Sequence, residues 1–429
     1  MKKRLPSFLN PIRNSELIRN SSLLISGNVL GMGVSFLIMP VLSRLYSDAD
    51  FGVFALMMSL TGILSLVATG KYEEALVLTK DKEEATHLLG FLMRLLSGSA
   101  LLLFLFFLFF REPTLSWVNM EVLIDYWWLI PLFVFLLGLY TILTNLANKV
   151  KHYKAMASAG LLLNLLNALS KVAAYFAMPF AGGLFAGQLS GQLLACFPFY
   201  KLRGYLTKAL STRREQRRAA ARKYRDFPVY NLPRGVLNSF SMNLPYLLLT
   251  GIFGEAKLGL FFMGFNITFR PISLISNSVY QVLYEKVAEM KQQQQRISPI
   301  IYTYWKQTLL YITPCFLLAF ALAPWLFKII FGAEWEESGT YFRYILPWML
   351  GVLVATPMGF LPLLFERQRT AMLLEGAYFL SRIAALAVGI YLHDFNLCIL
   401  SFSLVGLFFM VITLVWYRSL VREYERQLP

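Results

Sequence analysis

Five basic residues stand inside long apolar segments of this chain: Arg94, Lys171, Arg270, Lys306 and Arg382. A charged side chain at the centre of a bilayer costs about 2.5–3.5 kcal/mol on insertion scales, so such a residue is a functional candidate by default. Ammonium and guanidinium groups make strong, charge-assisted hydrogen bonds to phosphate oxygens. Basic residues that share a cavity between helices would therefore hold an anionic substrate, such as one that carries phosphate groups.

Three of these residues are the principal candidates for a cationic, substrate-binding cavity: Arg270, Lys171 and Arg382. Arg270 lies deepest and precedes Pro271, whose ring removes a helix hydrogen bond and can kink the segment. An internal ion pair is the alternative for each of them, and Glu375 stands seven positions before Arg382 on the same segment. Snorkelling towards the interface accounts for Arg94 and Lys306, which lie nearer to the ends of their segments.

Amides and one polar cluster accompany these charges. Asparagines in the first, seventh and eighth apolar segments, among them Asn28, Asn243 and Asn266, could bind sugar hydroxyls. They could equally join helices to one another, at about 0.6 kcal/mol per contact. Lys71, Tyr72 and Glu73 follow the second apolar segment, and we interpret them as a gate or a proton-coupling site, with a solvated helix end as the alternative.

The composition places these residues in a membrane protein. Hydrophobic residues make up 57% of the 429 residues and charged residues 15%, and the mean hydropathy is +0.56. Crossing a bilayer core of about 30 Å takes roughly 20 helical residues. Twelve apolar segments reach that length, so we predict an all-α, polytopic fold with spans at about 21–43, 51–70, 87–110, 126–148, 155–177, 181–202, 231–253, 257–283, 301–331, 340–363, 371–392 and 396–417.

The basic residues predict the orientation of these spans, because Lys and Arg near span ends favour the cytoplasmic side. With both termini in the cytoplasm, 5 of the 40 Lys and Arg residues lie deep within spans, and most of the others lie on the inside or at the inside ends of spans. Those on the outside are Arg44, Arg111, Lys257, Lys328 and Arg343. The long segment before the first span lacks the features of a cleaved signal peptide.

The expected domains are a cytoplasmic N-terminal segment (1–20), an N-lobe of six helices (21–202), a basic cytoplasmic linker (203–230), a C-lobe of six helices (231–417) and a cytoplasmic tail (418–429). The net charge of +16 is concentrated in the linker and needs no nucleic-acid partner. We expect residues 203–227 to contact anionic lipids, at about 1 kcal/mol per basic residue near the surface.

Two short phrases indicate that the lobes are duplicates. "LSRLYSDADFGVF" (Leu42–Phe54) and "LTGIFGEAKLGLF" (Leu249–Phe261) align at an offset of 207 residues. Six spans separate them, so the lobes would be related by a pseudo-two-fold axis along the membrane normal. Ser47 and Asp50 resemble a capping pair at a helix start, and glycines at 52 and 259 would let the two helices approach a neighbour closely.

The ordered set of phrases "SRLYSDADFGVFAL", "ATGKYEEALVL", "GLFAGQLSGQLL", "YRDFPVYNLPRGVLNSFSMNLPYLLLTGIFG" and "SLISNSVYQVLYEKVAE" resembles the polysaccharide-transporter family, the Wzx-type flippases of the multidrug/oligosaccharidyl-lipid/polysaccharide exporter superfamily. The resemblance implies two six-helix lobes, alternating access and an undecaprenyl-pyrophosphate-linked oligosaccharide as substrate. It also implies a multi-pass protein of the bacterial inner membrane, working beside a polysaccharide polymerase and a chain-length regulator. Lys71 stands where that family would have arginine, which keeps the charge and loses the bidentate fork.

Other functions remain as alternatives. The superfamily also contains ion-coupled multidrug (cation) antiporters and peptidoglycan-precursor flippases, and a polytopic glycosyltransferase or polymerase is more remote because the loops are short. "SLVATGKYEE" lacks the first glycine and the Ser/Thr of a nucleotide-binding loop. We therefore expect no enzyme activity, no ATP, no cofactor and no metal, and coupling to a gradient such as H⁺ or Na⁺.

Overall fold

The computed structural model describes residues 16–428, with side chains from Leu30 onward, and every regular element in that range is helical. The predicted N-terminal segment thus lies mostly outside the described residues, as does the side chain of Asn28. Each of the twelve predicted spans corresponds to a helix: α1 (Glu16–Leu45), α2 (Asp48–Thr69), α4 (Lys82–Trp117), α5 (Leu129–Lys149), α6 (Tyr153–Tyr175), α7 (Ala181–Ala195), α10 (Leu232–Phe253), α11 (Glu255–Gln292), α12 (Ser298–Phe331), α13 (Glu336–Ala355), α15 (Gln368–Tyr391) and α16 (Phe395–Arg426).

Ten of the helical segments in the described range are long and apolar enough to cross a membrane. The two predicted spans outside this set are α1 and α7. The described side chains of α1 cover only Leu30–Leu45. α7 has 15 residues, which is about 22 Å at 1.5 Å per residue. It is followed by the 3₁₀-helix η5 (Phe197–Leu202), which has Pro198 in its first turn. The chain is an all-α, multi-pass membrane protein, as the sequence predicts.

The helices form two compact units. Unit 1 contains residues up to Tyr46 and Leu56–Phe240, and unit 2 contains Ser47–Ala55 and the chain from Ser241 onward. The first nine residues of α10 (232–240) therefore belong to unit 1, although the predicted C-lobe begins at residue 231. Shorter elements complete the chain: α3 (Tyr72–Ala75), η3 (Leu76–Leu78), η4 (Glu121–Tyr126), α8 (Arg203–Leu210), α9 (Arg214–Lys223), η6 (Phe227–Asn231), η7 (Ala333–Trp335), η8 (Thr356–Met358) and α14 (Leu361–Leu364).

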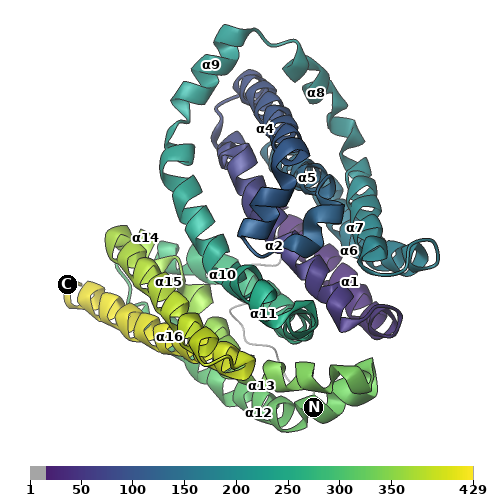
Figure 1. Cartoon of the computed structure of the whole chain (residues 1–429). Coiled ribbons are helices and arrows are strands. Elements are labelled where there is room, and N and C mark those ends of the chain that lie inside the picture. The colour runs from purple at the N-terminus through teal and green to yellow at the C-terminus, as the bar shows by residue number, and fades with distance from the viewer. Residues whose placement is uncertain (1–15, 429) are drawn as a thin grey trace, which may run out of the picture. The chain divides into compact units, whose positions relative to one another are not determined.

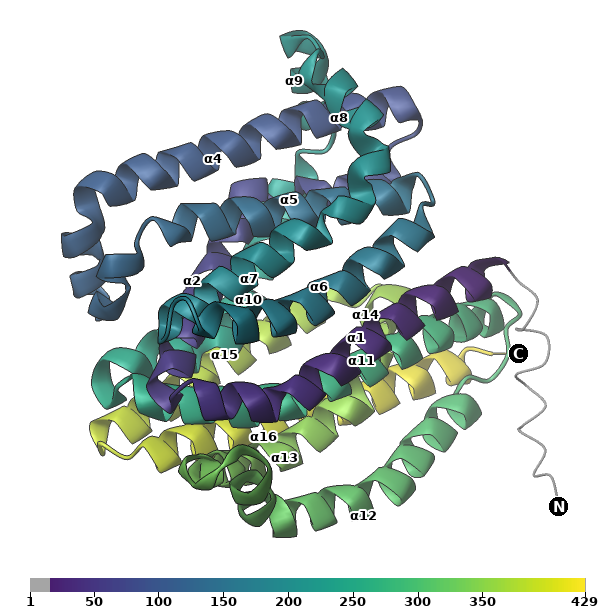
Figure 2. The ribbon, with the colours of Figure 1, turned by 90° about the vertical axis from the view of Figure 1, so that its right-hand side faces the viewer.

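Small residues bring the helices of unit 1 together. α6 packs against α1 and against α7. A Cβ added at Gly31 of α1 would lie 2.9 Å from the Cβ of Asn164, and one at Gly191 of α7 would lie 2.6 Å from the backbone nitrogen of Asn167. Apolar lipid gives helices no hydrophobic reason to associate, so close van der Waals packing at such residues takes its place. Figure 2 shows α4, α5 and α6 lying roughly parallel in this unit.

The basic linker predicted at 203–230 is helical and docked on α4. α8 and α9 lie across the end of α4 (Figures 1 and 2). A Cβ at Gly90 would lie 2.6 Å from the carbonyl oxygen of Ala209, so the end of α8 rests directly on the backbone of α4. Arg94 donates to the carbonyl oxygens of Gly90 (2.9 Å) and Leu210 (2.7 Å), which places its guanidinium at the C-terminus of α8. Lys223 forms an ion pair with Glu84 of α4.

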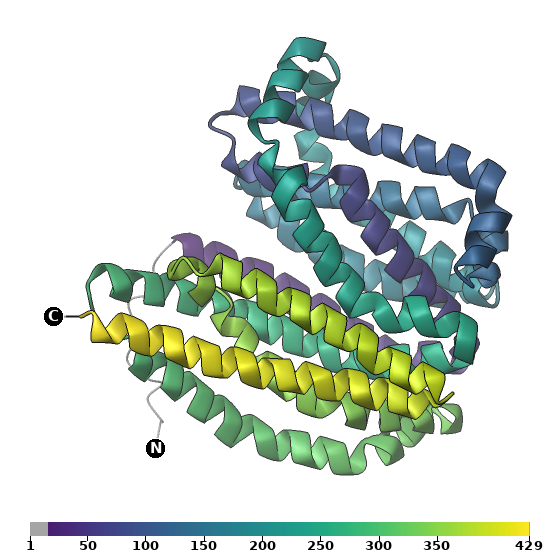
Figure 3. The same ribbon diagram turned by 60° about the vertical axis from the view of Figure 1, so that its left-hand side comes forward.

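The hub of unit 2 is α13, which contacts α11, α12 and α16. Tyr341, Ile345, Trp348 and Met349 of this helix are almost fully buried. α15 and α16 run side by side (Figure 3). A Cβ at Gly389 of α15 would lie 2.7 Å from the backbone nitrogen of Cys398 of α16, so these two helices also meet at a glycine.

The repeated phrase marks a reciprocal helix crossing inside unit 2. A Cβ added at Gly52 of α2 would overlap the carbonyl group of Glu255, whose carbon lies 2.7 Å away. A Cβ added at Gly259 of α11 would overlap the carbonyl group of Asp48, whose carbon lies 2.6 Å away. Positions 48 and 255 differ by the same 207 residues as 52 and 259. The prediction of close approach at these glycines is confirmed, and their neighbour is the other copy of the phrase.

The capping pair before α2 is also confirmed. The backbone N–H of Asp50 donates to the hydroxyl of Ser47 (3.2 Å), and the backbone N–H of Ser47 donates to the carboxylate of Asp50 (3.0 Å). Two helix-terminal donors are satisfied reciprocally, as in a capping box. This cap places the start of α2 where it crosses α11.

Candidate functional site

The polar cluster after the second span lies at a sharp corner of the chain. Gly70 and Lys71 both have φ of 60°, in the left-handed region. Glycine adopts this conformation freely, whereas for Lys71 it costs about 1–2 kcal/mol. The corner ends α2 and starts the single turn of α3, so that Lys71, Tyr72, Glu73 and Glu74 project from one short stretch in different directions.

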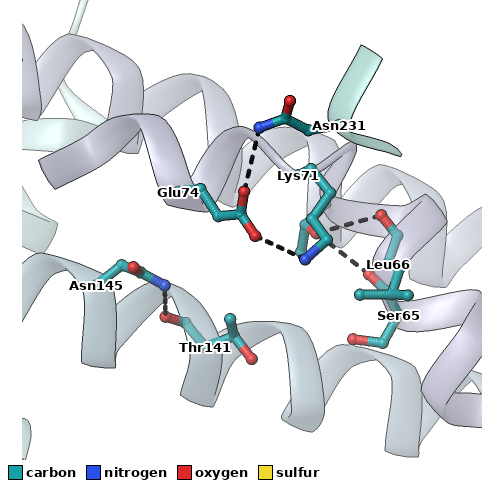
Figure 4. Close-up of polar contacts among 8 residues, drawn as sticks. Ser65, Leu66, Lys71, Glu74, Thr141, Asn145 and Asn231 are labelled. Carbon is teal, nitrogen blue, oxygen red and sulfur yellow. Dashed lines mark hydrogen bonds and ion pairs between the residues drawn. The ribbon is translucent and has the colours of Figure 1, made fainter. Parts of the chain in front are cut away.

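Lys71 and Glu74 form the exposed part of this cluster. The Lys71 ammonium lies 2.7 Å from the Glu74 carboxylate, and the Asn231 amide donates to the other oxygen of Glu74 at 3.3 Å. Figure 4 shows the amine and the amide pointing at this carboxylate from two sides. Asn231 comes from η6, immediately before α10, and a Cβ at Gly235 of α10 would lie 2.9 Å from Cε of Lys71. The cluster therefore ties the corner after α2 to the start of α10, within unit 1.

Tyr72 and Glu73 form the buried part. The Tyr72 hydroxyl donates to the carbonyl oxygen of Ala221 in α9 (3.2 Å), and its ring packs edge-on against Phe91 of α4. Glu73 is 2% exposed, and its Oε2 has no hydrogen-bond partner among the described residues. Burial raises the pKa of the Glu73 carboxyl, against smaller opposing effects from the Thr69 hydroxyl and the Lys71 charge. A buried carboxyl with a raised pKa is a candidate for proton exchange.

Arg270 and Asn266 form a second candidate group, one turn apart on α11. The Asn266 amide donates to the carbonyl oxygen of Phe262 (2.9 Å), and its oxygen accepts from Nε of Arg270 (3.1 Å). Among the described residues, Asn266 is the one hydrogen-bond partner of the Arg270 guanidinium, and Arg270 is exposed on unit 2. Both Nη atoms are left for an acceptor from outside the protein, a geometry that suits phosphate oxygens.

Lys171 of α6 is half-buried where α1, α6 and α7 meet. The hydroxyl of Tyr46 donates to its backbone carbonyl oxygen at 2.7 Å. A Cβ at Gly187 of α7 would lie 2.5 Å from its Cα. Its backbone therefore belongs to the tightest packing of unit 1, and its role in substrate binding stays a prediction.

Arg382 is enclosed by protein. It is 0% exposed, and its guanidinium carbon lies 4.1 Å from the ring centre of Tyr378, 4.2 Å from that of Phe402 and 4.4 Å from that of Trp348. Nη1 donates to the hydroxyl (3.2 Å) and the carbonyl oxygen (3.3 Å) of Ser241. Among the described residues, no carboxylate forms an ion pair with Arg382. The alternative of an internal ion pair is therefore wrong for Arg382. The cation rests on aromatic faces instead, and in this conformation it contacts protein on every side rather than an open cavity.

Sequence reasoning missed several polar residues that accompany these groups. Asn231 stands directly after the basic linker, where no sequence pattern marks it as a partner of Glu74. The aromatic residues around Arg382 come from three different helices, which the sequence does not relate to one another. Asn167 of α6 and Gln192 of α7 each bury a side-chain oxygen without a hydrogen-bond partner. The sequence signal for these two was available, because an unpaired amide inside an apolar span is itself unusual. Asn243 of α10 is half-buried, and its role stays a prediction.

Known structures share this fold along almost the whole chain. An inward-facing multidrug resistance transporter of the MATE family, in the MOP superfamily, matches with a TM-score of 0.69 and 12% identity over 94% of this chain and 100% of its own. The lipid II flippase MurJ, in an inward closed conformation, matches with a TM-score of 0.72 and 12% identity over 95% of this chain and 90% of its own. A MOP transporter from Pyrococcus furiosus Vc1 matches with a TM-score of 0.52 and 12% identity over 95% of this chain and 96% of its own. The chain therefore has the MOP transporter fold.

Sequence comparison gives the family. The model of the family described as "polysaccharide biosynthesis protein" matches residues 41–340, which is more than half of the chain. The chain belongs to this family of polysaccharide biosynthesis proteins, as the resemblance of its phrases predicts. No curated protein sequence matches it.

Proposed function

We propose that this protein is a flippase that moves an undecaprenyl-pyrophosphate-linked oligosaccharide from the cytoplasmic to the periplasmic leaflet during synthesis of O-antigen, capsule or exopolysaccharide. The observation that carries the proposal is the union of a polysaccharide-biosynthesis family with a transporter fold. In that pathway, a protein with a transporter fold would carry the lipid-linked glycan across the bilayer. The proposed protein lies in the bacterial inner membrane with both termini in the cytoplasm.

Arg270 is the residue that we assign to the pyrophosphate. Its guanidinium is held at Nε by Asn266, and its Nη atoms are left for phosphate oxygens. Pro271 lacks the backbone N–H that would otherwise bond the carbonyl oxygen of Ile267, four residues earlier. This carbonyl oxygen is then a further acceptor for sugar hydroxyls. Asn243, in the same unit as Arg270, is a second proposed substrate contact. Lys171 and Asn28 of unit 1 stay separate predictions, and Arg382 would contact substrate only after its aromatic enclosure opens.

Glu73 is the residue that we assign to proton coupling. A carboxyl that is 2% exposed, with one oxygen lacking a described partner, prefers to be protonated. Loss of its proton would place a second negative charge beside Glu74, in competition for Lys71. A change in the Lys71–Glu74 pair would also change the contact of Glu74 with Asn231, immediately before α10. The protonation of Glu73 would in this way affect the position of α10.

The proposal is tested in a strain that lacks the gene. We expect undecaprenyl-linked repeat units to accumulate on the cytoplasmic side and surface polysaccharide to disappear, with rescue by the wild-type gene. Absence of that accumulation, together with increased sensitivity to cationic drugs, would support the alternative of a multidrug antiporter, which the structural match to a MATE transporter favours. Rescue of a strain that lacks its lipid II flippase would support the second alternative, which the match to MurJ favours.

A further inference from the structure

A polar pocket of about 660 Å³ lies in unit 1, between the start of α4 and the docked linker. Three segments line it: the first turns of α4, the junction of η5 with α8, and the turn between α8 and α9. Its lining includes Lys82, His87, Lys201, Gly204, Tyr205 and Lys208. The volume is within the range of about 300–1,000 Å³ that is typical of sites for small ligands.

The charge in this pocket is unbalanced. The ammonium groups of Lys82, Lys201 and Lys208 make no ion pair or hydrogen bond with any described residue. The one acidic lining residue is Glu83, whose carboxylate lies 3.8 Å from Nε2 of His87. Glu83 balances only part of the charge of the three lysines, which repel one another, so an anion bound among them would be stabilised by all three.

Most hydroxyl groups of the pocket already donate to the protein and are not available as donors to a bound anion. Thr86, Ser211 and Thr212 donate their hydroxyl protons to backbone carbonyl oxygens, at 2.7, 2.9 and 2.7 Å. Gln216 accepts from the backbone N–H of Arg213 at 3.0 Å, which orients its amide and leaves the amide N–H groups for a ligand. Donors to an incoming anion are therefore the lysines, the Gln216 amide and the Tyr205 hydroxyl.

The walls of the pocket are fixed before any ligand arrives. Gly90 and Arg94 fasten the end of α8 to α4, and the Lys223–Glu84 ion pair fastens α9. A preformed site binds with a smaller ordering cost than a mobile loop does. The floor is formed by α4 between Lys82 and His87, where its long apolar run begins. The pocket lies beside the start of this apolar run, so we expect it to face the headgroup region of the bilayer.

We infer that this pocket binds a phosphate group through Lys82, Lys201 and Lys208, with an anionic phospholipid headgroup as its source in the membrane. Lysine ammonium groups bind phosphate as point charges and tolerate the varied geometry of a headgroup. Tyr205 and His87 carry the two rings among the described lining residues, whereas the three lysines stand beside the start of the apolar run of α4, which favours a lipid headgroup as the source of the phosphate. The inference is independent of the proposed transport substrate.

The test uses the purified full-length protein in detergent, with thermal unfolding as the readout. The probes are phosphatidylglycerol, phosphatidylcholine and inorganic phosphate. The pocket variant is Lys82→Gln/Lys201→Gln/Lys208→Gln, and the matched control is Arg218→Gln/Arg222→Gln/Arg225→Gln, which removes three exposed charges from the same basic region outside the pocket. Gly204→Phe is a second pocket variant, because a Cβ at Gly204 meets no atom within 4 Å and the ring would fill the space without removing a charge.

We expect phosphatidylglycerol to raise the unfolding temperature of the wild type and the control, while both pocket variants bind it at least tenfold more weakly. Phosphatidylcholine should have no such effect. Equal protection by inorganic phosphate would support the phosphate site and identify a free anion as its source. Equal losses in the pocket and control triple variants, or unchanged binding in Gly204→Phe, would overturn the inference, because the effect would then belong to the basic region as a whole.

Discussion

The reciprocal crossing of α2 and α11 makes a quantitative prediction about two glycines. Replacing Gly52 with alanine places a Cβ 2.7 Å from the carbonyl carbon of Glu255, and replacing Gly259 does the same at 2.6 Å from that of Asp48. Carbon atoms that are not bonded pack at about 3.5–4.0 Å. Each substitution therefore requires a displacement of at least about 1 Å, because the carbonyl oxygens lie nearer still, and backbone atoms, unlike the end of a flexible side chain, have little freedom to give way.

The energetic cost follows from what the displacement disturbs. The ring of Phe51 lies 5.3 Å from that of Trp335 and 6.3 Å from that of Phe262, and the ring of Phe54 lies 6.0 Å from that of Phe262. A radial gap of about 0.5–1 Å forfeits a quarter to a half of such contact energy. Overpacking of this kind typically costs about 1–3 kcal/mol. We expect about 2–3 kcal/mol for Gly52→Ala and a similar loss for Gly259→Ala.

The double variant distinguishes a shared crossing from two unrelated tight contacts. One separation of the two helices relieves both overlaps, so the second alanine should add little to the first. The double variant is expected to lose about 3 kcal/mol rather than the sum of the single losses, an interaction of about 2 kcal/mol in a double-mutant cycle.

The measurement is equilibrium unfolding of the purified protein in mixed micelles, followed by tryptophan fluorescence, to which Trp335 beside Phe51 contributes. Gly62→Ala is the matched control, because it lies on the same helix α2 and an added Cβ meets no atom within 4 Å. It should leave stability unchanged or raise it by up to about 1 kcal/mol. A Gly52→Ala protein as stable as Gly62→Ala, or strictly additive losses in the double variant, would refute the reciprocal crossing.

Four further predictions concern the charged residues. Arg270→Ala should leave the protein in the membrane and abolish surface polysaccharide, whereas Arg270→Lys should retain part of it; normal polysaccharide from Arg270→Ala would remove this residue from the site. Because burial raises the pKa of Glu73 above its ordinary 4.5, the folded protein holds this proton more tightly than the unfolded chain, so the stability contribution of Glu73 falls as the pH rises from that value through the raised pKa. Glu73→Gln should remove that dependence and stabilise the protein at neutral pH, and unfolding curves with the same pH dependence in both proteins would contradict the assignment. Arg382→Met should stay within about 1 kcal/mol of the wild type, since three cation–π contacts roughly offset the desolvation of a buried charge, while Arg382→Ala should lose about 3 kcal/mol; denaturant titration separates the two, and equal losses would show that the charge itself stabilises the fold. Arg94→Ala should release the end of α8, measured as faster proteolysis between residues 201 and 227, and an unchanged rate would show that Gly90 alone suffices.

The fold was predictable because its signal is long and repeated. Segments of about 20 apolar residues have few alternatives in a bilayer, and each predicted span is a helix. The start of α2 was predictable at single-residue level, since Ser47 and Asp50 stand at the spacing of a capping pair. The linker was harder to anticipate, because a run of basic residues predicts exposure but contains no information about Gly90 of α4, on which the end of α8 rests.

The arrangement of the charged residues could not be derived from the sequence. Depth within a span identifies a costly residue, but the direction of a side chain depends on partners from distant helices. Arg382 and Arg270 look alike in sequence, yet one is enclosed by the rings of Tyr378, Phe402 and Trp348, and the other presents its guanidinium at the surface of unit 2. Those three rings come from α15, α16 and α13, and no local pattern in the chain relates them.

Arginine side chains therefore have different structural roles in this membrane protein. Arg343 donates to the carbonyl oxygens of Phe320 and Ala321, both at 2.6 Å, where Pro324 of α12 has removed the N–H that would bond Phe320. Arg94 satisfies the carbonyl groups at the end of α8 in the same way. Arg343 and Arg94 thus donate to backbone carbonyl oxygens at helix ends or proline positions. The Nη atoms of Arg270, in contrast, have no acceptor among the described residues. The useful criterion for a substrate-binding arginine is thus not its depth in a span but whether donors that the protein itself does not use are also exposed, a condition that the buried Nε and Nη2 of Arg382 do not meet.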